Sequence, residues 1–391
     1  MTGVGNYLYN IVLALVEKRL DVEFYGLGYL RWHKIDIQLL SSIVNEHQTA
    51  PAPIEAGAAA IGASEMRRTR ALVHQRLAAI GYFRRLYHST RPLQFAISSR
   101  LQSLDLFHAF NYLPPADPGV PVLPVIYDLS FERMPETHPA DRLKQMKPLA
   151  KTVARAPLVH TISEFSRSEI STIFGYPSER IFVAPPAASA VFRPLGVQMT
   201  SREVDPFDLK TGMYFMTVGT LEPRKNLRTL IAAYGQLPAG VRSRMPLVIV
   251  GGTGWGDLQL PASTDQLIGR GEIRFLKGVN NQSLRGLYEG ARLMLFPSVY
   301  EGFGMPVVEA FACGTPVAHS SRTVMDEVSD GHAYRIEAMD VDAWTDIMLT
   351  SSQDPQDYRE PTKRELRIER ARFFNWHDSA DAVVQAYNAY R

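Results

Sequence analysis

The chain alternates short apolar runs with longer stretches in which apolar residues recur every three or four positions. Apolar residues dominate the runs 158–162, 215–219, 247–252 and 293–298, as is typical of parallel strands that are buried on both faces. The segment 226–237, which lies between two of these runs, has the spacing of an amphipathic helix. This alternation predicts an α/β fold with doubly wound parallel sheets.

The alternation of strand and helix patterns occurs twice, which predicts two domains. A single hydrophobic core stops growing at roughly 250 to 300 residues, and this chain has 391. A polar stretch interrupted by prolines separates the two series and has the composition of an interdomain linker. The last segment has a polar start and helical spacing, and we expect it to pack back on the first domain. The predicted boundaries are 1–195 for the N-terminal domain, 196–211 for the linker, 212–370 for the C-terminal domain and 371–391 for the terminal helix.

The N-terminal pattern begins in the middle of a β–α unit. Residues 2–26 predict a glycine turn, a helix and then a strand, whereas the strand that should lead into the glycine turn has no counterpart. We therefore expect the first strand of the N-terminal domain to be missing from this sequence, together with about ten upstream residues.

The overall composition is that of an ordinary globular protein. The formal net charge of +2 is too close to neutral to indicate a nucleic-acid partner. Cys313 is the only cysteine, so an intrachain disulfide and a thiolate metal cluster are both excluded, and a reducing compartment is indicated. No run of 18 apolar residues is present. These features predict a cytoplasmic protein that touches a membrane at most from its surface.

One segment, 64–100, differs from the rest of the chain in charge. It contains eight Arg and one acidic residue, Glu65, and apolar residues recur in it at spacings of three and four. The pattern predicts a basic amphipathic helix, which either packs as an ordinary helix with a solvated face or lies on an anionic membrane surface. The segment is therefore the candidate for peripheral contact with the inner face of the cytoplasmic membrane.

The stretch YEGFGMPVVEA, residues 300–310, carries the most specific candidate chemistry. It follows a buried strand pattern, so its loop lies at the carboxyl edge of the sheet, where α/β proteins bind ligands. Pro306 fits the first position of the next helix, and Gly314 lies just beyond its last turn. Glu301 in the loop and Glu309 near the end of the first helical turn can both accept hydrogen bonds from paired sugar hydroxyls.

A second candidate site is GTLEPRKNL, residues 219–227. Gly219 ends a strand pattern, and Arg224 and Lys225 stand in the loop before the next helix. Two adjacent cations at the carboxyl end of a strand suit a diphosphate, because Arg forms planar bidentate contacts and Lys adds a point charge.

Taken in order, these motifs resemble the retaining glycosyltransferases of family 4, which have the GT-B architecture of two Rossmann-like domains facing a central cleft. The Glu-x7-Glu loop together with Pro-Arg-Lys-Asn is highly specific for that family. The resemblance spans nearly the whole chain and is carried by TGVGNY (2–7), DLFHAFNYLPP (105–115), VIYDLSFERMPETHP (125–139), TISEFSRSEI (161–170), GTLEPRKNL (219–227), VIVGGTGWG (248–256) and LYEGARLMLFPSVYEGFGMPVVEAFACGTPV (287–317).

The resemblance implies a nucleotide sugar bound mostly against the C-terminal domain. It assigns the donor sugar to Glu301, the ribose to Glu309, and the diphosphate to Arg224 and Lys225. It also implies transfer with retention of configuration and without a metal ion, since cations, glycine amides and a helix N-terminus can neutralise a leaving diphosphate. The remaining donor-side candidates are Gly3, Gly5, Gly219, Gly302, Phe303, Gly304 and Met305.

The chain departs from the family pattern beside Asp128. Many relatives have a histidine at the preceding position, facing the reacting sugar, whereas this chain has Tyr127, whose hydroxyl is the candidate to take that place. His108 and Asn111 follow another strand pattern and are expected to face the cleft. These four residues are the candidates for the acceptor or sugar side, with a structural role as the alternative for His108 and a loop cap as the alternative for Asp128.

The predicted function is that of a retaining, metal-independent hexosyltransferase that uses a nucleoside diphosphate sugar. The loop at Arg224 and Lys225 looks like that of mannosyltransferases that build bacterial surface polysaccharide, which favours GDP-mannose over a UDP-hexose as donor and a glycan or polyprenyl-linked glycan as acceptor. One alternative is a non-catalytic nucleotide-sugar-binding or assembly subunit. Another is a nicotinamide-linked dehydrogenase using Gly3 and Gly5, although Leu8 replaces the third small residue of that fingerprint.

Overall fold

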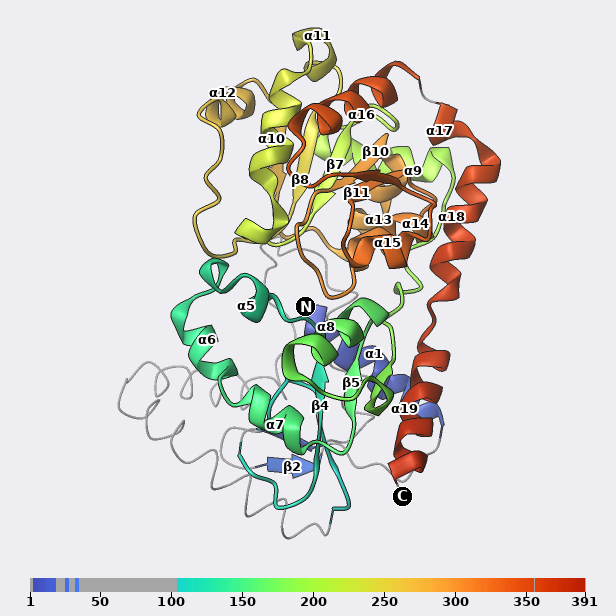
Figure 1. Cartoon of the computed structure of the whole chain (residues 1–391). Helices are drawn as coiled ribbons and strands as arrows, with labels where there is room; N and C mark the ends of the chain where they lie inside the picture. Colours follow the sequence, from blue (N-terminus) through green and yellow to red (C-terminus); the bar gives the residue numbers. More distant parts are fainter. Residues whose placement is uncertain are drawn as a thin grey trace, which may run out of the picture.

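The computed structural model consists of two lobes, each with a parallel β-sheet and surrounding helices (Figure 1). The lobes lie one above the other in this view, and the chain passes from the lower lobe to the upper one and back. This arrangement confirms the predicted α/β class. The basic segment 64–100 lies outside the described residues, which are 3–18, 25–27, 32–34, 104–114, 116–354 and 356–390.

The lower lobe is built on a four-stranded parallel sheet. A two-stranded antiparallel pair, β1 (Tyr25–Leu27) with β2 (Trp32–Lys34), lies near its end. The sheet order is β3 (Phe107–Ala109), β4 (Val122–Ile126), β5 (Val159–Thr161) and β6 (Ile181–Val183), and the helices are α1 (Gly3–Glu17), α5 (Ser130–Arg133), α6 (Ala140–Met146), α7 (Leu149–Arg155) and α8 (Glu164–Phe174), with 3-10 turns at Pro135–Thr137 and Ser178–Arg180.

Two helices of this lobe have informative ends. Ser163 caps α8 by accepting a hydrogen bond from the Ser166 backbone N–H, and Gly175 closes the helix in the left-handed conformation. α1 already begins at Gly3, so Gly3 and Gly5 lie inside its first turn and not in a turn before it. The predicted glycine turn is wrong in this respect, because the backbone there is helical.

The upper lobe is built on a six-stranded parallel sheet whose first strand in the chain lies in the interior of the sheet, as in doubly wound folds. Two of its strands, 247–250 and 293–296, are buried along their whole length, as their apolar sequences predict. The sheet order is β12 (Tyr334–Ile336), β11 (Val317–Ser320), β10 (Leu293–Phe296), β7 (Phe215–Val218), β8 (Leu247–Val250) and β9 (Ile273–Leu276), and the helices are α9 (Val197–Val204), α10 (Leu227–Gln236), α11 (Ala239–Arg242), α12 (Thr264–Gly269), α13 (Asn281–Gly290), α14 (Met305–Ala312), α15 (Val324–Ser329), α16 (Val341–Gln353), α17 (Gln356–Arg359) and α18 (Pro361–Phe373).

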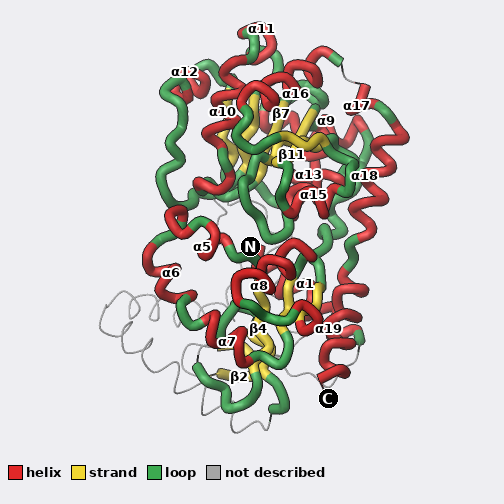
Figure 2. Tube along the Cα trace, viewed as in Figure 1, coloured by secondary structure: helices red, strands yellow, loops and turns green. Residues whose placement is uncertain are grey.

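Two connections join the lobes (Figure 2). The segment 196–211, interpreted above as a linker, contains α9, which packs on α13 of the upper lobe. At the other end of the chain, α18 packs along α14 and leads into α19 (Trp376–Tyr390), which packs on α1 of the lower lobe. Lys18 and Asp381 form an ion pair of 2.6 Å between α1 and α19. The last helix is therefore part of the lower lobe.

The apolar core runs without interruption through the junction of the lobes. One cluster joins Leu129 of the lower lobe to Phe303 and Met325 of the upper lobe, and a second cluster, around Trp344, fills the other face of the upper sheet. Among the described residues, no helix combines the length and the apolar character that crossing a membrane requires.

Candidate active site

The loop between β10 and α14 leaves the sheet at its carboxyl edge and crosses the junction of the lobes. Gly304 precedes α14 with a φ of +104°, which few residues other than glycine adopt. Pro306 is in the first turn of α14, and Gly314, with a φ of +79°, lies just past its end. The predicted start and end signals of this helix are confirmed, and they hold Glu301 in the loop ahead of it.

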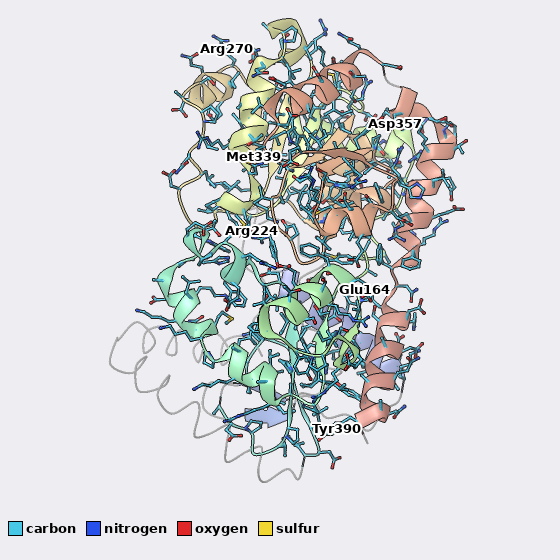
Figure 3. All side chains as sticks on the ribbon, in the orientation of Figure 1. Glu164, Arg224, Arg270, Met339, Asp357 and Tyr390 are labelled. Atoms are coloured by element: carbon cyan, nitrogen blue, oxygen red, sulfur yellow. The ribbon has the colours of Figure 1, made fainter. Side chains whose placement is uncertain are left out.

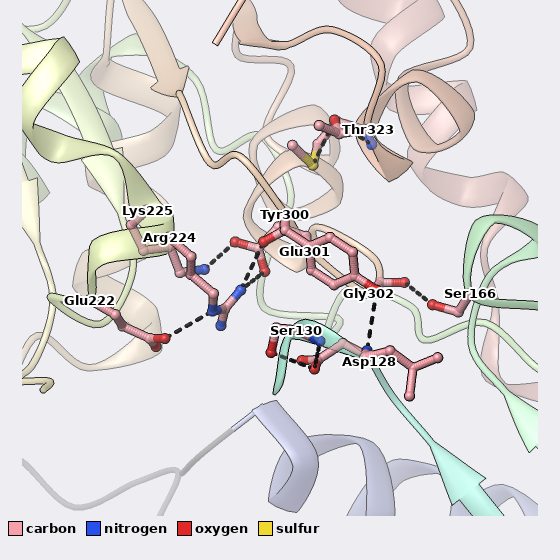
Figure 4. A network of polar contacts seen from close by, with 12 residues as sticks. Asp128, Ser130, Ser166, Glu222, Arg224, Lys225, Tyr300, Glu301, Gly302 and Thr323 are labelled. Atoms are coloured by element: carbon pink, nitrogen blue, oxygen red, sulfur yellow. Dashed lines mark hydrogen bonds and ion pairs between the residues drawn. The ribbon is translucent and has the colours of Figure 1, made fainter. Parts of the chain in front are cut away.

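Four charged side chains meet at this loop (Figure 4). The carboxylate of Glu301 accepts hydrogen bonds from Arg224, at 2.6 Å, and from Lys225. Arg224 also donates to Glu222 at 2.9 Å and to the carbonyl oxygen of Tyr300 at 3.1 Å. Glu301 is 7% exposed and Glu222 is 4% exposed. We call Glu222, Arg224, Lys225 and Glu301 the charged cluster; its two cations and two carboxylates balance.

The charge of Glu301 depends on its cationic neighbours. Burial alone would raise the pKa of this carboxyl group, but Arg224 and Lys225 outweigh burial and lower the pKa to about 2. Glu301 is therefore ionised at neutral pH, and both cations are held by a carboxylate of the protein itself.

Hydrogen bonds between loops fix the position of the two cations. Arg224 and Lys225 belong to a 3-10 turn, after which Asn226 adopts a left-handed conformation. The Asn226 side chain donates to the carbonyl oxygens of Pro297, at 3.2 Å, and of Ala338, at 2.7 Å. Beside the cluster, a small hollow at the carboxyl ends of β7 and β10 is lined by residues that include Thr217, Gly219, Lys225, Phe296 and Ser298.

Gly302 packs directly against the backbone of the lower lobe. A Cβ atom at this position would lie 1.8 Å from the carbonyl oxygen of Tyr127, so only glycine fits against the lower lobe here. The Gly302 carbonyl accepts hydrogen bonds from the hydroxyls of Ser163, at 2.7 Å, and Ser166, at 3.2 Å. The loop that carries Glu301 is thus held by side chains at the start of α8.

Three further hydrogen-bonded contacts join the lobes around this loop. The hydroxyl of Tyr300 accepts from the backbone of Leu129 at 3.2 Å. The carboxylate of Glu327 accepts from two backbone N–H groups at the start of α8, at 2.9 and 2.8 Å, where the helix dipole favours a negative charge. Trp255 donates its indole N–H to the carbonyl oxygen of Thr137 at 2.9 Å.

Glu309 lies on α14, apart from the hydrogen bonds of the charged cluster. Its carboxylate accepts a hydrogen bond of 2.9 Å from the hydroxyl of Tyr288 on α13. Burial raises the pKa of Glu309 to about 7, although the Tyr288 hydrogen bond partly opposes this. The two glutamates of the Glu-x7-Glu loop therefore differ in charge, since Glu301 is fully ionised at neutral pH and Glu309 is close to half-protonated.

The candidates on the lower lobe lie in different surroundings. The Tyr127 hydroxyl donates to the carbonyl oxygen of Phe110 at 2.8 Å, and what Tyr127 presents to Gly302 is its own carbonyl. Asp128 accepts from the backbone N–H and the hydroxyl of Ser130, at 3.1 and 2.8 Å, in a local turn just before α5. Asn111 is exposed. Phe303 is buried in the core and Met305 begins α14.

His108 belongs to a buried chain of four side chains. The Tyr7 hydroxyl donates to the carbonyl oxygen of Ala184 at 2.8 Å, so it must accept from Nε2 of His160, also at 2.8 Å. Nδ1 of His160 then accepts from Nε2 of His108 at 3.0 Å, and Nδ1 of His108 accepts from the Tyr387 hydroxyl at 2.6 Å. We call Tyr7, His160, His108 and Tyr387 the neutral chain.

Both histidines of the neutral chain are uncharged at neutral pH. Burial lowers the pKa of His160 to about 3, and burial together with His160 lowers that of His108. Among the described residues, no hydrogen bond of His108 reaches the charged cluster, and no group of three His, Cys, Asp or Glu side chains is arranged to hold a metal ion.

Four residues of the junction and one of the neutral chain were not predicted from the sequence. Glu222 precedes the predicted cation pair and Tyr300 precedes Glu301, so charge and proximity offered a signal for both. Ser163 and Ser166 had only the signal of a helix cap. His160 had none, because its partner His108 is 52 positions away in the chain.

Comparison with known proteins identifies the relatives of the chain. Residues 202–367 match the family model described as glycosyl transferases group 1. The chain is 32% identical over 392 residues to O-antigen chain mannosyltransferase B of Escherichia coli, a match that covers 99% of this chain and 96% of that protein. It is also 26% identical over 238 residues to the serotype-specific mannosyltransferase WbdA of Escherichia coli, which covers 60% of this chain and 29% of that protein.

Solved structures share the fold. Alr3699/HepE of Anabaena, in complex with UDP and glucose, aligns with a TM-score of 0.59 at 17% identity, over 76% of this chain and 81% of that one. WaaG, a glycosyltransferase involved in lipopolysaccharide biosynthesis, aligns with a TM-score of 0.55 at 17% identity, over 78% of this chain and 80% of that one. These likenesses confirm the predicted GT-B fold.

Proposed function

The chain belongs to the group 1 glycosyltransferases, and from this membership we propose that it transfers mannose from GDP-mannose to a growing surface polysaccharide. The two mannosyltransferases named above support the choice of sugar. Membership of an enzyme family also speaks against a non-catalytic subunit and against a dehydrogenase.

The observation that carries the proposal is the charged cluster at the junction of the lobes, where Figure 3 also labels Arg224. Together, the two phosphates of a nucleotide sugar carry about two negative charges. Arg224 and Lys225 supply two positive charges on one short turn, and Arg can hold phosphate oxygens in a bidentate contact. The cations therefore bind the diphosphate, and Glu309 binds the ribose.

Donor binding exchanges one anion for another. Glu301 pairs with both cations in the structure, and phosphate oxygens of the donor compete with it for them. A released Glu301 carboxylate then accepts hydrogen bonds from hydroxyls of the donor sugar. It also lies where it can stabilise positive charge that develops at the anomeric carbon.

Transfer proceeds on one face of the sugar. The bond between the anomeric carbon and the diphosphate oxygen breaks, and its electron pair goes to the phosphate, which Arg224 and Lys225 stabilise. The acceptor oxygen forms the new bond on the face that the phosphate leaves, and its proton passes to the departing phosphate oxygen. Configuration is therefore retained, and the protein's cations supply the charge stabilisation without a metal ion.

The acceptor is a glycan carried on a membrane lipid, and the protein acts at the inner face of the cytoplasmic membrane. The eight Arg in residues 64–100 support this part of the proposal, because clustered cations bind anionic headgroups. Sedimentation with liposomes should therefore increase with the fraction of anionic lipid, and binding that ignores anionic lipid would contradict membrane contact.

The experiment is a donor screen followed by product analysis. Thermal unfolding is measured with GDP-mannose, UDP-glucose and their parent nucleotides, and transfer to a mannose-terminated acceptor is then followed with the best donor. We expect the largest stabilisation from GDP-mannose, an α-linked product by NMR, and unchanged turnover in EDTA. A β-linked product would refute retention, loss of turnover in EDTA would refute metal independence, and exclusive use of a UDP-sugar would refute the donor.

A further inference from the structure

His138 is a half-buried histidine of the lower lobe that has no assigned role. It ends the short 3-10 turn Pro135–Thr137, and both of its ring nitrogens are buried without a hydrogen-bond partner among the described residues. Buried polar atoms without a partner cost free energy, so such atoms in a native protein usually meet a ligand or water. The ring nitrogens of His138 therefore mark a place where a polar molecule is expected.

The surroundings of His138 are those of the junction between the lobes. Asp128 and Arg224 are close enough to act on its charge in opposite directions. Its ring faces the indole of Trp255 with 6.1 Å between the centroids, and Trp255 in turn holds the preceding residue, Thr137, by a hydrogen bond of 2.9 Å. His138 thus lies at the junction of the lobes, where Trp255 of the upper lobe contacts its ring and holds the residue before it.

The chemistry of this pair suits a sugar. Burial, the largest influence, lowers the pKa of His138, so its ring is neutral at neutral pH and offers one donor and one acceptor. A hydroxyl group can both accept a hydrogen bond from the ring N–H and donate one to the other ring nitrogen. A phosphate only accepts hydrogen bonds, and an ammonium group only donates them. Trp255 is 38% exposed, which leaves part of an apolar indole surface for the C–H face of a pyranose.

Resting on the proposed function, we propose that His138 and Trp255 form a binding subsite for the terminal sugar of the acceptor glycan. His138 exchanges hydrogen bonds with hydroxyls of that sugar, and Trp255 packs against its ring. The position favours the acceptor over the donor, because the cations that bind the donor diphosphate come from the upper lobe and His138 comes from the lower one. The exposure of Trp255 also lets the rest of a long glycan leave the site.

The test uses the full-length chain and compares acceptor KM with donor Kd. The wild type is first assayed with GDP-mannose and a mannose-terminated synthetic acceptor; if it neither binds nor uses any nucleotide sugar, the proposed function fails and the subsite fails with it. His138→Phe keeps an aromatic ring beside Trp255 but removes both nitrogens. We expect it to raise acceptor KM about tenfold, as for the loss of a hydrogen bond or two, with donor Kd changed less than about twofold.

One further His138 variant and a matched control extend the test. His138→Gln restores a donor and an acceptor and should recover much of the acceptor affinity. The matched control is His377→Phe, which alters an exposed histidine on α19 and should change neither constant. An unchanged acceptor KM in His138→Phe would show that only water meets the ring, and a donor Kd raised by the same factor as KM would assign the site to the donor; either result overturns the proposal.

Trp255 gives a second, independent measurement should His138→Phe unfold. Trp255→Phe keeps an apolar surface and loses only the hydrogen bond to Thr137, whereas Trp255→Ala loses both. We expect acceptor KM to rise about tenfold in Trp255→Ala and by no more than about threefold in Trp255→Phe. Equal effects of the two substitutions, or no effect of either, would refute the packing of a sugar on this indole.

Discussion

Each lobe buries a polar network, and the two networks differ in charge. The charged cluster of the upper lobe holds two cations and two carboxylates on loops at the junction of the lobes. The neutral chain of the lower lobe holds two histidines and two tyrosines on strands and helices inside the lobe. The charged cluster consists of groups that can form ion pairs with a ligand. The neutral chain consists of groups that satisfy one another's hydrogen bonds.

The difference separates the proposed binding site from a structural element. Burying charges costs desolvation free energy, and removing one partner leaves the other charge uncompensated. A cluster of this kind is therefore expected to have a role other than stability. In the neutral chain each donor has one acceptor and the sequence of hydrogen bonds ends on a backbone carbonyl. Burial of polar groups is therefore a poor indicator of function by itself. Buried charged groups whose partner a charged ligand can replace are a better indicator.

The largest expected effect comes from removing a cation of the charged cluster. Lys225→Ala should lower kcat/KM about 100-fold or more, because the leaving diphosphate loses a positive charge at the point where its own charge develops. Steady-state kinetics with GDP-mannose measure this. Lys144→Ala, which removes an exposed lysine on α6, serves as the control and should stay within about twofold. Turnover of Lys225→Ala at the wild-type rate would show that Lys225 does not stabilise the leaving diphosphate, and the charged cluster would then not differ from the neutral chain in function.

The second effect is on stability and concerns the neutral chain. His160→Phe keeps an aromatic ring against Phe182 but leaves the Nε2–H of His108 without an acceptor. We expect a loss of about 1–3 kcal/mol in the free energy of unfolding, measured with urea, and little change in donor Kd. A variant that retains full stability but binds the donor poorly would mean that the neutral chain belongs to the site.

Acid should weaken the neutral chain selectively. The pKa of His160 is about 3 in the folded protein and about 6.5 in the unfolded chain, so the unfolded state takes up protons first. The contribution of the neutral chain to stability is therefore complete above about pH 6.5 and is lost as the pH falls from there toward 3. The wild type should lose more stability than His160→Phe between pH 7 and pH 5.

A smaller effect concerns Glu309 and sharpens the difference between the two glutamates. With a pKa of about 7, this carboxyl group is the stronger acceptor for ribose hydroxyls once it has lost its proton. Donor affinity should fall about tenfold between pH 8 and pH 6, as measured by calorimetry. Glu309→Gln should bind more weakly at pH 8 and lose this pH dependence; a variant that keeps it would place the titrating group elsewhere.

The smallest expected effect lies at the contact between the lobes. Ser166→Ala removes one of the two hydroxyls on the Gly302 carbonyl and leaves the Ser163 cap of α8 in place. We expect donor KM to rise about threefold, because a neutral hydrogen bond contributes about 1 kcal/mol. Ser243→Ala, which alters an exposed serine bonded to a helix carbonyl, is the control and should have no effect.

Sequence patterns predicted the features that depend on local chemistry. Buried strands such as β8 and β10 have apolar sequences, and Gly314 lies just past the end of α14 as expected. Sequence also placed Glu301, Arg224 and Lys225 at the same edge of the sheet, because parallel strands bring their carboxyl ends together there. Their direct ion pairs were not predicted.

What the patterns missed depends on packing between distant segments. The hydrogen bond to Glu309 comes from α13, and the hydrogen bonds of His108 come from β5 and α19. The contact of Ser163 with Gly302 depends on how the two lobes meet, over 139 positions of sequence. No local spacing encodes such relationships, so the same residue types could equally have stood at the surface.

The place of α19 bears on the order in which the protein is made. Its 15 residues complete the lower lobe, where Tyr387 bonds His108 and Asp381 pairs with Lys18, yet they are translated after the entire upper lobe. While the ribosome still encloses residues 376–390, the lower lobe lacks one of its helices, α19. The lower lobe therefore cannot complete its packing until residues 376–390 have been synthesised, after the whole upper lobe.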